Sequence, residues 1–222
     1  MKKIAIITAM ESEFNAICSQ YDFACNDGID RTEVYGKEIL LIKSGIGKVH
    51  GALAAAKACN GGADLVITTG LAGGIDASLT QGDIVLAEKV CYHDVWCGEP
   101  NAKGQIQDMP LYYETPQDIL RQSIINAPES YFHLGLTVTG DQFLTDPVRL
   151  NEIKADFPAA LATDMESAAI AQVCYLHQTP FMSLRIISDV VGKPEQEEQY
   201  NAFWQNVPSK AAEMVNIVLK NL

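Results

Sequence analysis

The sequence predicts a single α/β domain over residues 1–222, with a central mixed sheet flanked by helices. Three observations favour this class. Strand and helix patterns alternate from one end of the chain to the other. A chain of 222 residues is long enough to bury one substantial core. It contains no internal repeat, low-complexity tract or Pro/Ser-rich linker that would divide it.

In the first half of the chain, buried-strand patterns alternate with helical ones. Apolar runs predict strands over 3–8, 38–43 and 64–69, and helical character predicts helices over 11–20 and 47–60. In the second of these helices, Val49, Leu53 and Ala56 are spaced for one helix face. The strand over 64–69 is followed by the glycine-rich segment GLAGG at 70–74, which is expected to close it.

The second half continues the alternation around one long irregular stretch. Strands are predicted over 83–87, 133–139 and 181–187, and a helix over 165–176. Residues 197–222 are expected to form two helices, the last starting near Pro208, because proline suits a first helical turn and breaks a helix interior. The stretch 96–116 predicts a loop, either a surface excursion or part of a binding site.

Composition excludes several classes of partner and site. The net charge of −12 argues against nucleic-acid and anionic-membrane partners, which require clustered Lys and Arg. The N-terminus has too short an apolar run for a signal segment, and no run approaches a membrane span. Six cysteines without a CxxC pair and four scattered histidines predict reduced, mostly buried thiols, a cytoplasmic protein and no metal site.

Acidic residues fall near the ends of three predicted elements, where ligands of open α/β sheets bind. Glu13 lies in the helix after the first strand, Glu166 opens the apolar helix 165–176, and Asp189 follows the strand 181–187. A buried acid is costly unless it is paired or binds something, and two adjacent hydroxyls such as those of a ribose would suit Glu166. Helix capping and internal ion pairing remain open alternatives, and Arg185 is expected to pair with one of the acids.

The glycine-rich segment matches no phosphate-binding pattern. It is neither GxGxxG nor GxxxxGK followed by Ser or Thr, so neither the dinucleotide nor the P-loop mechanism applies. Its glycines would allow the backbone to approach a ligand closely, but many strand ends look similar.

Six motifs taken together resemble the 5′-methylthioadenosine/S-adenosylhomocysteine nucleosidases of the purine nucleoside phosphorylase superfamily. They cover nearly the whole chain in the family's order: AMESE at 9–13, SGIGK at 44–48, TGxAGG at 69–74, GDxF at 140–143, ME at 165–166 and SD at 188–189. The resemblance implies a nucleoside phosphorylase-like three-layer sandwich and a homodimer without a cofactor. It also implies hydrolysis of the N-glycosidic bond of a 5′-substituted adenine nucleoside, as in methionine salvage.

The resemblance also implies roles for individual residues. Glu13 would activate the hydrolytic water, Asp189 would protonate adenine N7, and Glu166 would accept hydrogen bonds from the ribose, with Met165 packed against the sugar. The other implied contacts are Phe143 and the backbone of Leu144 for adenine; Arg185, Ser188, Ala72 and Gly73 as supporting residues; and Ile46, Pro110 and Tyr200 for the 5′ pocket, which the partner subunit would close.

Two other functions are weighed against hydrolysis. Phosphorolysis requires arginines that clamp phosphate, and none of the four arginines lies in 44–48 or 69–74. A silent nucleoside-binding protein would not need all three acids. Two positions depart from the family pattern, because Leu71 stands where serine is usual and Asp164 where glutamate is usual. The 5′-substituent stays open, and the segment 192–198 is predicted either as a lid or as a solvated loop.

Overall fold

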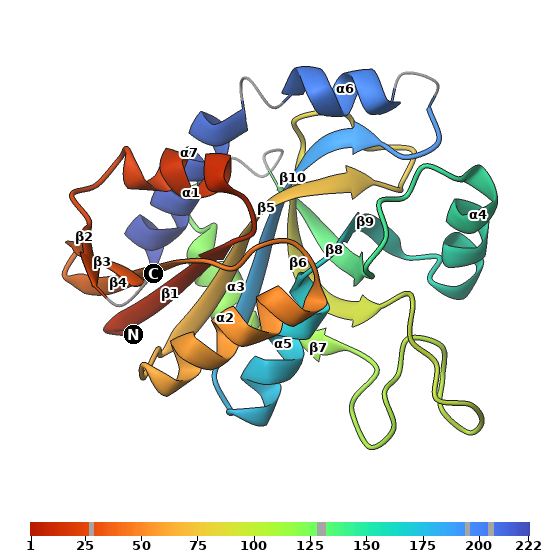
Figure 1. The fold of residues 1–222 in the computed structure, drawn as a ribbon, viewed down its shortest axis with the longest axis horizontal. Helices are drawn as coiled ribbons and strands as arrows, with labels where there is room; N and C mark the ends of the chain where they lie inside the picture. Colours follow the sequence, from red (N-terminus) through yellow and green to blue (C-terminus); the bar gives the residue numbers. More distant parts are fainter. Residues whose placement is uncertain (27–28, 128–131, 194–195, 204–206) are drawn as a thin grey trace.

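The computed structural model describes residues 1–26, 29–127, 132–193, 196–203 and 207–222. One mixed sheet runs through the molecule, with helices packed on both of its faces (Figure 1). This arrangement confirms the predicted fold class. None of the helices in the described ranges is long and apolar enough to cross a membrane.

The strands include all six that the sequence predicts. Their bounds are β1 (Lys3–Thr8), β2 (Ala24–Asn26), β3 (Ile29–Val34), β4 (Lys37–Lys43), β5 (Leu65–Gly74), β6 (Ile84–Tyr92), β7 (Tyr113–Glu114), β8 (Phe132–Thr139), β9 (Ala160–Asp164) and β10 (Phe181–Val190). The sheet order is β10-β6-β8-β9-β5-β1-β4-β3-β2, and β10 also pairs with β5. The strands β5, β10, β6, β8 and β9 therefore form a closed circuit.

The helices that cover the sheet form two layers. Their bounds are α1 (Glu11–Cys18), α2 (Lys48–Asn60), α3 (Gln117–Ser123), α4 (Pro147–Asp156), α5 (Ser167–Leu176), α6 (Gln196–Phe203) and α7 (Val207–Asn221). One face of the sheet is covered by α1, α3 and α7 and the other by α2 and α5, each with its own apolar cluster (Figure 1). The C-terminal segment forms two helices, and α7 begins one residue before Pro208, as predicted.

The glycine-rich segment does not end the third predicted strand, so this part of the prediction is wrong. The strand β5 continues through it to Gly74 and pairs there with β10 and β9. A Cβ on Gly73 would lie 2.9 Å from the Val191 side chain, so glycine is what allows the two strands to approach. The neighbouring strand β10 is also longer than predicted and carries a register shift between Ile187 and Asp189, which re-aims the side chains at its end.

The helix α2 packs through a face that the larger apolar residues do not mark. Its buried residues are Gly51, Ala54, Ala55 and Ala58, whereas Val49 is 71% and Leu53 60% exposed. A Cβ on Gly51 would lie 3.1 Å from Ile170 of α5, which shows how closely the two helices approach. Small residues therefore face the core, and the larger ones form an exposed apolar strip.

The cysteines agree only partly with the prediction. All six are free, but only Cys91 and Cys174 are buried, while Cys25 and Cys97 are exposed. The prediction of mostly buried thiols is wrong. The loop over 96–116 is irregular as predicted, apart from the short strand β7.

Candidate active site

A pocket lies beyond the carboxyl ends of β1, β5, β8, β9 and β10, where the sequence predicts a ligand site. It contains about 610 Å³ of space including its open mouth, which falls within the range of small-molecule sites. All of the predicted site residues line it except Pro110, which lies on a separate hollow with Tyr112 and Tyr175. Elements distant in sequence thus bring the predicted residues together.

Glu13 is fixed by three backbone N–H groups. Its Oε2 accepts from Met10 at 3.0 Å and from Ala9 at 3.1 Å, and its Oε1 accepts from Leu71 at 3.0 Å. The side chain is 3% exposed, and burial raises its pKa even though these hydrogen bonds and the nearby Arg185 oppose the shift. The bond to Met10 is a helix-capping interaction, so Glu13 caps α1 and lines the pocket at once.

Glycine at position 70 is required by the approach of Glu13. A Cβ there would lie 2.6 Å from Glu13 Oε1 and 3.0 Å from Arg185 Nη1. Position 71 contributes through its backbone, because the Leu71 N–H holds Glu13 while the Leu71 side chain packs against the cluster beneath α7.

Arg185 lies fully buried among three carboxylates. Its Nε is 2.8 Å from Asp164 Oδ2, and its Nη2 is 3.6 Å from Glu166 Oε2, so the predicted pairing with an acid is confirmed. Its guanidinium also donates to the hydroxyls of Ser167 and Thr68. The surrounding carboxylates raise its pKa against the effect of burial, so it stays charged.

Glu166 lies at the start of α5 and is also buried. Its Oε1 accepts from the Gly47 N–H at 2.9 Å. Burial raises its pKa to about 7, against the opposing charge of Arg185 and with further increase from Asp164. Asp164 caps α5 instead, accepting from the Ser167 N–H at 3.2 Å. The shorter acid at position 164 therefore serves both the helix terminus and the arginine.

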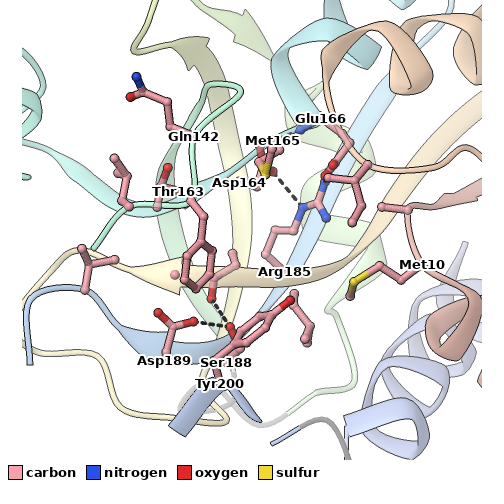
Figure 2. Close-up of a pocket in the computed structure, with 18 of the residues that line it drawn as sticks. Met10, Gln142, Thr163, Asp164, Met165, Glu166, Arg185, Ser188, Asp189 and Tyr200 are labelled. Carbon is pink, nitrogen blue, oxygen red and sulfur yellow. Dashed lines mark hydrogen bonds and ion pairs between the residues drawn. The ribbon is translucent and has the colours of Figure 1, made fainter. Parts of the chain in front are cut away.

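Asp189 forms a second acidic position with different partners. The Ser188 hydroxyl donates to its Oδ1, and Gln196 Nε2 donates to its Oδ2 at 2.8 Å. Burial raises its pKa, and the opposing influences are these two neutral hydrogen bonds. Figure 2 shows Asp189 and Ser188 on one side of the pocket, and Arg185 with Asp164 and Glu166 on the other.

The rest of the pocket wall is mostly apolar. The ring of Phe143 is half exposed and meets Tyr200 edge-on at 5.1 Å between centroids. Ile46, Ala72 and Gly73 also line the pocket, and Ile46 is more than half exposed. Within the described ranges, no group of three or more His, Cys, Asp or Glu side chains is arranged to hold a metal ion.

Sequence reasoning missed one buried polar residue of this region. Gln196, at the first position of α6, is 5% exposed and donates to both Asp189 and the Leu144 carbonyl. It lies in the segment 192–198, whose residues 194 and 195 are outside the described ranges. No sequence signal distinguishes this glutamine, because the surrounding segment is polar throughout.

Comparisons with known proteins identify a family and similar relatives for this chain. The family model of the phosphorylase superfamily matches residues 3–221. The 5′-methylthioadenosine/S-adenosylhomocysteine nucleosidase of Lysinibacillus sphaericus is 35% identical, over 98% of this chain and 97% of that protein. The corresponding nucleosidase of S. pneumoniae, solved with the transition-state inhibitor MT-ImmA, superposes with a TM-score of 0.92 at 32% identity, covering 99% of each chain. The S-adenosylhomocysteine nucleosidase of Streptococcus pyogenes, solved with 5-methylthiotubericidin, gives 0.94 at 30% identity, covering 100% of this chain and 97% of that one.

The raised pKa of Glu166 predicts a specific pH dependence of stability. In the unliganded folded protein this carboxyl keeps its proton up to about pH 7, whereas in the unfolded chain it loses it near its ordinary value of 4.5. The folded state therefore binds more protons in this window, and its contribution to the free energy of unfolding falls as pH rises, by about 1–3 kcal/mol. Urea denaturation between about pH 5 and about pH 8 measures this slope.

Glu166→Gln is expected to flatten the slope, because the amide does not titrate. Glu33→Gln, at an exposed position on β3, is the matched control and should keep the wild-type slope. A Glu166→Gln protein with the wild-type pH dependence would contradict the assignment.

Proposed function

The chain belongs to the phosphorylase superfamily and, within it, to the 5′-methylthioadenosine/S-adenosylhomocysteine nucleosidases, and from this premise we propose how its pocket works. It is an N-glycosyl hydrolase of adenine nucleosides. The observation that carries the mechanism is that three buried carboxyl groups, those of Glu13, Glu166 and Asp189, surround one pocket with a single, already paired cation among its described lining residues.

The leaving base requires a proton. Adenine departs as an anion unless N7 is protonated, and Asp189 is the acid placed to supply the proton. Its burial raises its pKa, which favours the protonated form. Ser188 holds one oxygen of this carboxyl, and the half-exposed ring of Phe143 offers a surface on which the purine can stack. We therefore place the purine between Phe143, Leu144 and Asp189.

The sugar belongs on the opposite side of the pocket. Glu166 can accept hydrogen bonds from two adjacent ribose hydroxyls, since Gly47 donates to only one of its oxygens at 2.9 Å and Arg185 lies 3.6 Å from the other. Met165 lies beside it and supplies an apolar contact for the ring. As the glycosidic bond breaks, the ribose gains positive charge, which the carboxylates of this side stabilise.

Water is the nucleophile that this pocket favours. Glu13 has a raised pKa and faces the pocket, so it is suited to orient a water molecule and accept its proton. Phosphorolysis would require a cation free to bind phosphate. Arg185 is the only cation among the described lining residues, and it is already paired with Asp164 and Glu166, so none of these residues offers a free cation to phosphate.

The 5′-substituent would extend toward the pocket mouth. Ile46 and Tyr200 line the pocket, and these contacts support a methylthio group or a longer thioether. We propose that 5′-methylthioadenosine, S-adenosylhomocysteine and 5′-deoxyadenosine are the substrates and that the reaction serves methionine salvage. Six free cysteines support a reducing compartment such as the cytoplasm.

Homodimerisation is supported by the exposed apolar strip of α2. Val49 and Leu53 of this helix, and Ile46 two residues before its start, are all more than half exposed. A contiguous apolar surface of this kind favours association with another protein surface. Because Ile46 also lines the pocket, a second copy of the chain seated here would cover the pocket mouth.

The reaction is expected to be independent of phosphate. Purified protein in phosphate-free buffer should convert 5′-methylthioadenosine into adenine and a free reducing sugar, and added phosphate should not raise the rate. Adenine release is measured by chromatography and the sugar by a reducing-end assay. Release of a sugar 1-phosphate, or a strict requirement for phosphate, would establish phosphorolysis. Binding of 5′-methylthioadenosine without release of adenine would indicate a silent binding protein.

Substitution of the two proposed acid–base groups is expected to lower turnover. Glu13→Gln and Asp189→Asn keep the shape of each side chain but remove its titratable proton, and each should reduce kcat by about 10²–10⁴-fold. Steady-state kinetics with 5′-methylthioadenosine measures this loss, and circular dichroism checks the fold. Glu33→Gln serves as the control at an exposed site. Wild-type turnover in both variants would refute the assignment.

A charge in the exposed strip of α2 is expected to separate the subunits. Leu53→Asp should convert a dimer into a monomer in sedimentation-velocity experiments, because burial of an unpaired carboxylate opposes association. The matched control is Val148→Asp on α4, whose side chain is 65% exposed and lies away from the strip. A wild-type monomer, or a Leu53→Asp dimer, would contradict the proposed interface.

A further inference from the structure

The first residue of α6 turns its side chain into the protein instead of toward solvent. Gln196 is 5% exposed, although α6 is a polar helix whose Glu198 is exposed. Gln196 Nε2 donates to the Leu144 carbonyl at 2.7 Å and to Asp189 Oδ2 at 2.8 Å, and its Oε1 accepts from the Gly192 N–H at 3.0 Å. All of its polar atoms are therefore paired.

The two acceptors that Gln196 joins lie on the proposed purine side of the pocket. Asp189 and Leu144 both line the pocket, as does Phe143, on whose ring the purine would stack. One nitrogen with two N–H groups bridges them. The exocyclic 6-amino group of adenine offers the same donors, since it is also a planar nitrogen with two N–H groups.

We propose that the Gln196 carboxamide is an internal stand-in for the 6-amino group of adenine. This inference rests on the proposed function. In the unliganded enzyme, Gln196 keeps the Asp189 and Leu144 acceptors paired. When adenine binds, its amino group replaces the amide at these acceptors, and the first turn of α6 moves outward with Gln196.

Such an exchange follows from the cost of buried, unpaired acceptors. A buried carbonyl or carboxylate oxygen without a donor loses its hydration without compensation. Gln196 prevents this loss while the site is empty, and adenine prevents it when the site is filled. A base without an amino group cannot replace the amide, so Gln196 would remain in place when such a base binds. Gln196 thus competes with adenine but not with unsubstituted purine.

The test compares adenine and unsubstituted purine, which differ only in the amino group. Gln196→Met keeps the length of the side chain but removes the donor. It should bind adenine about five- to tenfold more tightly than the wild type, because the competitor is gone. Purine should bind no more tightly, because the variant loses the amide that pairs the acceptors. Isothermal titration calorimetry on the full-length protein measures both dissociation constants.

Controls separate this competition from a structural role. Glu198→Ala, at an exposed position of the same helix, should bind both bases like the wild type. If Gln196→Met does not fold, Gln196→Ala replaces it. This second variant should also bind adenine more tightly than the wild type and purine no more tightly. If the Gln196 variant bound adenine and purine equally weakly, the glutamine would only position Asp189, and the inference would be overturned. Unchanged adenine affinity would overturn it as well.

The same measurements distinguish failure of the proposed function from failure of the role assigned to Gln196. If the wild type neither binds adenine nor releases it from 5′-methylthioadenosine, the proposed function fails and this inference with it. If the wild type releases adenine but loss of the Gln196 donor does not favour adenine over purine, the proposed function stands and only the role of Gln196 is refuted.

Discussion

The burial of Arg185 within a ring of carboxylates is the constraint on which the site depends. A guanidinium that is 1% exposed must be paired, and here Asp164 lies 2.8 Å away and Glu166 3.6 Å away. Removing Asp164 would take away the carboxylate that lies nearest to the guanidinium. The arginine thereby fixes the ends of β9 and β10 and the start of α5 relative to one another. It also holds the carboxylates close together, which contributes to the raised pKa of Glu166.

Glycine residues allow this charged cluster to form at all. The ordered approach of Glu13 to β5 leaves no space for a side chain at position 70, where a Cβ would lie 2.6 Å from a carboxylate oxygen. At position 73 a Cβ would meet Val191, two residues beyond Asp189. The glycine-rich segment 70–74, which matches no phosphate-binding pattern, therefore has a structural role. It lets a strand, a helix terminus and a second strand end meet closely enough to share one pocket.

Much of the fold and site could be predicted because apolar runs and acidic residues leave local signals. The strand β1 and the pairing of Arg185 are examples. The extension of β5 could not be predicted, because glycine normally weakens a strand and only the tertiary pairing with β10 and β9 stabilises it here. The buried face of α2 could not be predicted from hydrophobicity, because its residues are small and less hydrophobic than the exposed Val49 and Leu53. Gln196 was missed because burial of one glutamine in a polar segment depends on acceptors distant in the sequence.

The acids of the pocket differ in what surrounds them, and this difference determines what each can do. Glu13 and Glu166 share one cation with Asp164, so this group of side chains holds more negative than positive charge when all three acids are ionised. A neutral nucleoside does not relieve this imbalance, but a ribose with developing positive charge does. Asp189 is not among the acids paired with Arg185, and burial raises its pKa, which favours its protonated form. Under the proposed function, the pocket would be complementary to the transition state of bond cleavage, with a proton on the side of the base and negative charge on the side of the sugar.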